Sequence, residues 1–192
     1  MTTRRQRILP PLMLVLAMIV TLVLLNRPLV RGDGLAYLVW IDTLVLDRDI
    51  NLNNQHDRFR EVNTYQIQWN DDQQRWVNIF PFGIAIPQTP FYLLGAGMEN
   101  VLDANPDYFR QMQGMGQSYS LWLMIGANVM AVIAALCAYG IGWRVCGRWL
   151  AALIAYAVFV GTPLVYYSTI TPVNSHNPGA FALAVFLLLL AR

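Results

Sequence analysis

The chain has 192 residues, of which 56% are hydrophobic and 12% are charged, and its formal net charge at pH 7 is +2. Soluble domains carry roughly 25% charged residues, and a chain of this length cannot bury so much apolar surface in a soluble core. The composition therefore excludes an ordinary soluble domain and indicates a membrane protein or part of one, with membrane lipid and no nucleic acid as partner.

Four apolar segments are predicted to cross the membrane. They cover residues 8–25, 120–143, 149–168 and 178–192. At about 1.5 Å per residue, roughly 20 helical residues match a hydrocarbon core of about 30 Å. The fourth segment is short, and the chain ends inside it. We therefore interpret residues 1–192 as a single transmembrane domain that forms the N-terminal part of a longer protein.

Charge predicts the orientation of these segments. All 11 acidic residues lie between Asp33 and Asp107, and the 13 basic residues are all arginine. Arginines precede the first segment, separate the second from the third at Arg144 and Arg148, and end the chain. The positive-inside rule places these arginines in the cytoplasm and residues 26–117 in a long extracytoplasmic loop.

The long loop begins with a predicted helix over residues 34–46. Asp33 stands at its start, where a carboxylate can accept free backbone N–H groups. Glycines flank this aspartate, as expected where the chain turns sharply or another group approaches the backbone closely. The helix is apolar nearly all round, so it must lie on lipid or under protein. Residues 47–59 are polar and are predicted as a loop. The alternation in VNTYQIQW, followed by NDDQQ and RWVNIF, then predicts a β-hairpin.

Residues 82–98 are apolar but are not predicted to cross the membrane. Pro87, Pro90 and three glycines interrupt them, and both residue types break helices. A crossing here would also place Arg144 and Arg148 outside, against the positive-inside rule. We interpret the segment as lying on or dipping into the outer membrane face, with a true span as the alternative.

A second outer loop, STITPVNSHNPG, covers residues 168–179. Parity places it on the same side as the long loop. We predict that His176, together with Asn174, lies near the helix that Asp33 starts and helps to shape a site there. The alternative for His176 is a polar loop residue without chemistry.

The order of these features resembles the N-terminal part of GT-C glycosyltransferases. Residues 33–38 read D-G-L-A-Y-L and match D-G-x-x-Y-L, and residues 81–94 match P-x-G-x(6)-P-F-Y-L-L. An apolar span precedes these motifs, and paired spans with a short arginine turn follow them. The pattern is most similar to bacterial lipid A aminoarabinose transferases and protein O-mannosyltransferases, and the likeness covers nearly the whole chain.

The resemblance implies an all-α polytopic membrane protein. Its GT-C-like transmembrane helix bundle would carry a long first extracytoplasmic loop with juxtamembrane helices and a small β-hairpin. It would sit in the bacterial cytoplasmic (inner) membrane with its active site facing outside. It would transfer a sugar, with inversion, from a polyprenyl-phosphate-linked donor to an acceptor hydroxyl. An acidic residue in the first outer loop is the acid/base group of that superfamily, and the position matches Asp33. Members often have Asp-Glu or Glu there, whereas glycine follows here.

Such a reaction needs a base, cations for the leaving phosphate and an apolar surface for the prenyl chain. Asp33 is the predicted base, with the cap role alone as its alternative. The predicted substrate-binding residues are Arg31, Tyr37, Arg58, Arg60, Asn174 and His176. Each arginine has the alternative of a solvated loop residue that balances nearby acidic side chains. No cofactor or metal site is indicated, and a divalent cation stays open.

The alternative function is a non-catalytic membrane protein, either a transporter portion or an accessory subunit on the same fold. A transport path would place charged residues inside the spans. The segments 8–25, 120–143 and 149–168 contain none, which favours the transferase.

Overall fold

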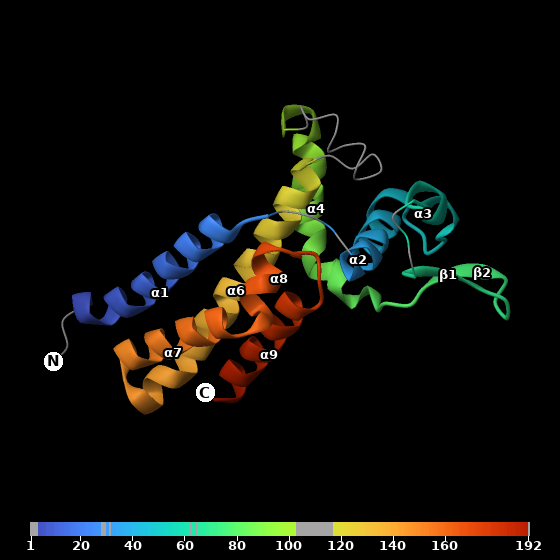
Figure 1. Ribbon diagram of the computed structural model, residues 1–192. Helices are drawn as coiled ribbons and strands as arrows, with labels where there is room; N and C mark the ends of the chain where they lie inside the picture. The colour runs from blue at the N-terminus through green and yellow to red at the C-terminus, as the bar shows by residue number, and fades with distance from the viewer. Residues whose placement is uncertain are drawn as a thin grey trace. The chain divides into compact units, whose positions relative to one another are not determined.

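The computed structural model describes residues 4–27, 30, 32–61, 63, 65–102 and 117–191. Within them the protein is mostly helical and has one two-stranded antiparallel sheet (Figure 1). The chain divides into two compact units. Unit 1 comprises residues 1–27, 127–170 and 175–192, and unit 2 comprises residues 28–126 and 171–174. The helical class and the small hairpin agree with the sequence prediction.

Unit 1 is entirely helical in the described residues. Its elements are α1 (Arg4–Leu25), the C-terminal part of α6 (Gln117–Cys146), α7 (Arg148–Gly161), α8 (Pro163–Thr169) and α9 (His176–Leu190). Leu14, Met18 and Leu22 of α1 share one core with buried alanines of α6 and α7. Small side chains allow helices to approach closely where lipid gives no hydrophobic driving force. The hydroxyl groups of Thr21 and Tyr156 lie 2.8 Å apart and link α1 to α7.

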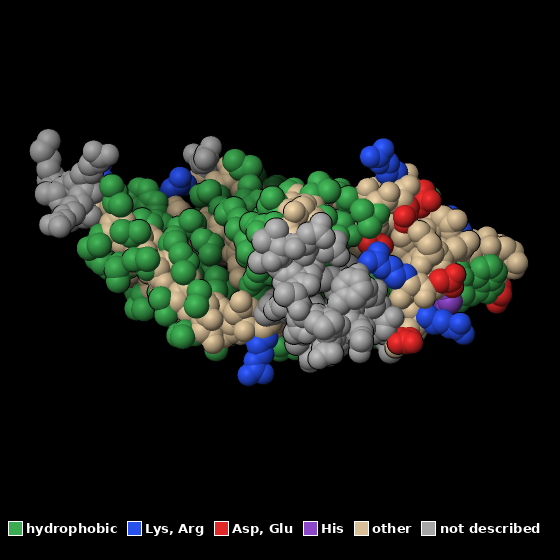
Figure 2. All heavy atoms as spheres, turned by 90° about the horizontal axis from the view of Figure 1, so that it is seen from above, with side chains coloured by type: hydrophobic (Ala, Val, Ile, Leu, Met, Phe, Trp, Pro, Cys, Tyr) green, Lys and Arg blue, Asp and Glu red, His purple; other side chains and the backbone are tan. Residues whose placement is uncertain are grey.

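Two helices of the described chain, Arg7–Leu25 and Ser118–Cys146, are long and apolar enough to cross a membrane. Large apolar side chains also stay exposed along α1, α7 and α9. Hydrophobic side chains accordingly cover these helices, whereas charged side chains gather over elements of unit 2 (Figure 2). Because soluble proteins rarely expose such continuous apolar surface, the helices indicate membrane association.

The segment predicted as a span over residues 149–168 is not one straight helix. It consists of α7 and α8, which meet at an angle of 68°. Thr162 between them is extended, with φ −119° and ψ 166°, and its hydroxyl accepts a hydrogen bond from Leu164 N. Proline disfavours helical geometry in the residue before it and suits the first position of a new helix. The Thr162–Pro163 pair therefore ends α7 and starts α8.

Unit 2 is built around a short buried helix. Its elements are α2 (Asp33–Asp42), the π-helical turn η1 (Thr43–Asp47), α3 (Asn53–Arg58), β1 (Ile67–Asn70), β2 (Arg75–Asn78), η2 (Phe82–Ile84), α4 (Ala85–Leu102) and the start of α6. The helix predicted over residues 34–46 is thus α2 followed by η1. Residues 47–59 were predicted as a loop, but they contain the short helix α3. Its sequence, NNQHDR, has no apolar periodicity from which a helix could be predicted.

Protein covers α2 on nearly all sides. Leu35, Leu38 and Ile41 belong to one core with residues of the hairpin, α4 and α6. Two hydrogen bonds fasten the hairpin and the residues after it to α2. Asn78 Nδ2 donates to Ala36 O at 2.7 Å, and Trp40 Nε1 donates to Phe80 O at 2.7 Å. The apolar character of the helix is therefore satisfied by burial under protein.

The hairpin predicted from the alternating sequence is present, but burial does not follow the alternation, because Trp69 is exposed and Gln66 is buried. β1 and β2 pair antiparallel, with Ile67 opposite Asn78 and Asn70 opposite Arg75. Residues 71–74 form the turn, and Gln74 has a positive φ of 49°. The residues NDDQQ, predicted to form the turn, therefore coincide with the turn in the structure.

The prediction that proline and glycine break the segment 82–98 is wrong, because α4 runs unbroken from Ala85 to Leu102. Pro87 lies in the first turn, where a missing N–H costs nothing. Gly95 is a packing residue, since a Cβ there would lie 2.8 Å from the Cα of Tyr119 in α6. This helix is not one of the two described helices apolar enough to span.

Gly95 and Gly97 provide a matched test of this packing. Gly95→Ala should destabilise unit 2 by about 1–3 kcal/mol, because the added methyl group pushes α4 away from α6. In the part of the chain that the structure describes, nothing lies within 4 Å of a Cβ built at Gly97. Gly97→Ala should therefore be neutral or stabilise by up to about 1 kcal/mol. Thermal unfolding in detergent would measure both, and equal melting temperatures would contradict the close contact.

Candidate functional site

The chain enters α2 through Gly32, whose φ of 51° and ψ of −125° make it the residue before the helix. Glycine adopts a positive φ without steric cost. Gln66 Nε2 donates to Gly32 O at 3.0 Å, so the residues before β1 hold this turn. Asp33 is consequently the first helical residue, one position inside the predicted cap. A carboxylate there still interacts favourably with the positive end of the helix.

Tyr65 holds the Asp33 carboxylate. Its phenol Oη donates to Asp33 Oδ1, and this hydrogen bond is the main cause that raises the pKa of Tyr65. Asp33 Oδ2 makes no hydrogen bond to the described residues. The Tyr65 side chain stays 42% exposed and Asp33 is partly exposed. Among the residues that the structure describes, the carboxylate is thus oriented through one oxygen and unengaged at the other.

Gly34 allows the loop around Val173 to approach α2. A Cβ at Gly34 would lie 2.6 Å from Val173 O, so the loop backbone passes directly against the first helical turn. Val173 is 1% exposed in the core of unit 2, and Asn174 is also buried. The close approach expected from the flanking glycines is therefore present. Residues 171–174 belong to the same compact unit as Asp33.

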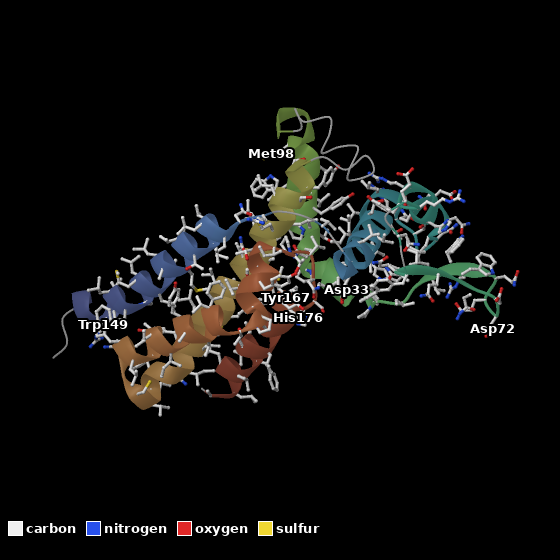
Figure 3. All side chains as sticks on the ribbon, in the orientation of Figure 1. Asp33, Asp72, Met98, Trp149, Tyr167 and His176 are labelled. Carbon is white, nitrogen blue, oxygen red and sulfur yellow. The ribbon has the colours of Figure 1, made fainter. Side chains whose placement is uncertain are left out.

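His176 starts α9 in unit 1. Its ring stacks on Tyr167, with centroids 3.9 Å apart and an interplanar angle of 18° (Figure 3). The neighbouring Asn177 is buried, and its Nδ2 donates to Tyr167 O and Ala127 O, both at 3.2 Å. The aromatic and amide contacts anchor the start of α9. Sequence reasoning did not single out Asn177, because an asparagine beside a proline looks like ordinary turn chemistry.

A buried ion pair occupies the other end of α2. Arg58 Nη1 lies 3.1 Å from both carboxylate oxygens of Asp42, and Tyr92 Oη donates to Asp42 Oδ1 at 2.6 Å. The Asp42 side chain is 3% exposed, and that of Arg58 is 34% exposed. Burial, together with the Asp42 carboxylate, raises the pKa of Tyr92, so its phenol stays protonated as a donor.

The other predicted binding residues fall in different environments. Arg31 lies outside the described residues. Tyr37 is 4% exposed, and its ring meets Phe80 edge-on at 5.4 Å, so it packs inside unit 2. Arg60 is exposed after α3. Arg58 and Arg60 thus differ sharply, because only the former is engaged with a buried carboxylate.

Sequence reasoning missed the partners of both carboxylates. Tyr65 stood on one face of an alternating strand with Ile67 and Trp69, a pattern that indicates packing. Tyr92 belonged to the apolar P-F-Y-L-L motif. Neither pattern carries a signal for a hydrogen bond to a residue 32 or 50 positions earlier in the chain.

No group of three or more His, Cys, Asp or Glu side chains in the described part of the chain could hold a metal ion. No protein-family model, curated protein or solved structure matches the chain. The chemistry of the site therefore has to be inferred from its side chains. An oriented, partly exposed carboxylate can accept a proton from a hydroxyl group held within hydrogen-bond distance.

Replacing Arg58 and, in a separate variant, the exposed Arg60 tests whether the ion pair between Arg58 and Asp42 stabilises the protein. Arg58→Met leaves the Asp42 carboxylate buried without its cation, and we expect a loss of about 3 kcal/mol, the lower end for breaking a buried pair. Arg60→Met, two residues away, should change stability by less than about 0.5 kcal/mol. Unfolding in detergent would measure both. Equal effects would show that the Arg58–Asp42 pair is energetically unimportant.

Proposed function

We propose that this protein is an integral membrane glycosyltransferase of the GT-C type. It transfers a sugar from a polyprenyl-phosphate-linked donor to an acceptor hydroxyl at the extracytoplasmic face. The observation that carries the proposal is the contrast between two carboxylates on α2. Asp42 is buried and neutralised by Arg58, whereas Asp33 is partly exposed, is oriented by Tyr65, and keeps one oxygen without a donor among the described residues. Asp33 is the carboxylate available for proton transfer.

In the proposed reaction, Asp33 Oδ2 accepts the proton of the acceptor hydroxyl as its oxygen attacks the anomeric carbon. The new C–O bond forms on the face opposite the phosphate, and the bond between the anomeric carbon and the phosphate oxygen breaks. Polyprenyl phosphate leaves with the electron pair of that bond. The attack from the opposite face inverts the configuration at the sugar carbon.

Cations must stabilise the phosphate as it leaves. Arginine matches phosphate oxygens with a planar fork of N–H donors. Because Arg58 already binds Asp42, the proposed phosphate ligands are Arg31 and Arg60. Asn174, which belongs to the same compact unit as Asp33, is proposed to shape the acceptor side of the site. Tyr37, buried beneath Phe80, supports the site by packing.

The membrane arrangement supports this assignment. Arg7–Leu25 and Ser118–Cys146 are suited to span a bilayer, and the acidic residues are confined to the chain between them. We propose a polytopic bundle in the bacterial inner membrane with residues 26–117 outside. A carboxylate close to the exit of a span would meet a lipid-borne phosphosugar at the depth of its head group.

Asp33→Asn tests the proposed base, with Asp72→Asn as its control. Asparagine keeps the size of the side chain but cannot accept the proton. We expect release of polyprenyl phosphate from synthetic mannosyl- and glucosyl-phosphoryl polyprenol to fall by at least about 100-fold. Asp72 lies in the hairpin turn (Figure 3), and its replacement should leave release unchanged. Near-normal release by a folded Asp33→Asn protein would rule out Asp33 as the base.

Tyr65→Phe tests the orientation of the carboxylate. Removal of the phenol hydroxyl deletes the hydrogen bond that orients the Asp33 carboxylate. We expect kcat to fall by about 10-fold or more while KM for the donor stays unchanged, because Tyr65 does not hold substrate. Tyr166→Phe, at a 48% exposed tyrosine of unit 1, is the control. A change confined to KM would instead assign Tyr65 to substrate binding.

A further inference from the structure

Unit 2 contains a groove that the proposed reaction does not use. Its apolar part has a volume of about 500 Å³ and is walled by Trp40, Trp76 and Phe82. Its polar part, about 360 Å³, is lined by Trp69, Asn51 and other residues. Both parts share Trp76, so the two cavities adjoin at that ring. Volumes of this size are typical of small-molecule sites in proteins.

The aromatic side chains of the groove are held at fixed angles. Trp40 is anchored through its Nε1 bond to Phe80 O, and its ring lies 6.3 Å from that of Phe82 at 70°. Trp69 and Trp76 lie 5.5 Å apart at 72°. His56 stacks on Trp76 at 3.5 Å. Such edge-to-face pairs fix ring orientation before any ligand arrives, and three of the six tryptophans of the chain line this groove.

Amide and guanidinium groups complete the polar part. Asn51, Asn53, Gln74 and Arg75 line it, and no carboxylate lines either described cavity. The side-chain amide of Asn53 makes no hydrogen bond to the described residues, and Asn53 is exposed. Each amide both donates and accepts hydrogen bonds. Asn51 Oδ1 accepts from Asn53 N, Gln74 Nε2 donates to Asp71 O, and Arg75 Nε donates to Gln73 Oε1. These bonds hold the polar groups in place, and the Asn53 amide is left to bind a ligand that both donates and accepts.

We propose that this groove binds a neutral saccharide. A sugar ring presents C–H groups on one face, which pack against an aromatic ring, and hydroxyl groups at its edge, which donate to and accept from amides. A lipid chain would bury the polar part of the groove without hydrogen bonds, at a cost of about 1–3 kcal/mol per group. The described lining contains one arginine and no carboxylate, which disfavours a cationic ligand.

The groove lies on the helix that carries the proposed base. Trp40 follows Asp33 by seven residues on α2, which corresponds to about 10 Å along the helix axis. A bound chain of a few sugars would bridge that distance. The saccharide would then be the acceptor, and this last assignment alone rests on the proposed function.

Binding can be measured without any donor. Chitotetraose, mannotetraose and maltotetraose would each be titrated into the protein in lipid nanodiscs while tryptophan fluorescence is recorded. At least one should give a saturable change. Trp69→Ala and Asn53→Ala, both at exposed residues, should weaken its binding at least about 10-fold, the equivalent of 1.4 kcal/mol.

Two control variants lie outside the groove. Trp149→Ala replaces a 58% exposed tryptophan at the start of α7 (Figure 3), and Gln68→Ala replaces an exposed amide of β1. Both should bind as the unchanged protein does. Failure of all three saccharides to give a saturable change would overturn the proposal, as would equal weakening by groove and control variants. Because no transfer is measured, either result is independent of the Asp33→Asn experiment.

A spin label tests the competing occupant, a lipid chain. Asn53→Cys would be labelled in a protein whose Cys137 and Cys146 are replaced by serine. A saccharide groove must open to water, so a water-soluble nickel relaxant should reach the label more readily than oxygen does. Preferential relaxation by oxygen would place the groove in lipid and overturn the proposal.

Discussion

The organisation of unit 2 depends on the ion pair between Asp42 and Arg58, completed by the phenol of Tyr92. These residues come from the ends of α2 and α3 and from α4, elements that are distant in the sequence. Charges removed from water gain little net stability even when paired, but a broken pair is costly. Any packing of α2 that separates Asp42 from Arg58 would leave a buried charge without its partner. The pair therefore disfavours such alternative packings more than it stabilises the observed one. With its C-terminal end fixed in this way, α2 can hold Asp33 in a defined place at its other end.

The two ends of α2 carry the same side chain in opposite surroundings. Asp42 has its charge compensated by a guanidinium and its oxygens occupied, so it has no role left except a structural one. Asp33 is partly exposed and keeps one oxygen without a protein donor among the described residues. Pairs of titratable groups with such divergent environments commonly divide structural and chemical tasks between them. The hydrogen bond from Gln66 to Gly32 and the contact of Gly34 with Val173 hold the exposed carboxylate from both sides.

Sequence patterns predicted those parts of the fold that depend on local periodicity. Apolar length identified α1 and α6, and strict alternation identified the hairpin with its turn. The sequence predictions were wrong at residues whose neighbours in the sequence suggest one role and whose tertiary contacts give them another. Glycine normally destabilises a helix, yet Gly95 lies within α4 and lets the backbone of α6 pack closely against it. Arg58 reads as a solvated cation, yet it neutralises a carboxylate 16 residues earlier. Asp33 was predicted as a site residue from its motif and flanking glycines, whereas the sequence pattern gave no signal for its hydrogen-bond partner Tyr65.

The 68° bend at Thr162 restricts what can surround the bundle of unit 1. An α-helix leaves the last four carbonyl groups without partners inside the helix, so the end of α7 presents such groups. If α7 and α8 together cross a bilayer, these carbonyls lie at membrane depth, where hydrocarbon offers them nothing. Irregular backbone is tolerated there only against protein or in a water-filled cavity. Lipid chains therefore cannot pack against the end of α7. Water or another protein segment must reach the depth of the bend to provide hydrogen-bond donors for these carbonyl groups.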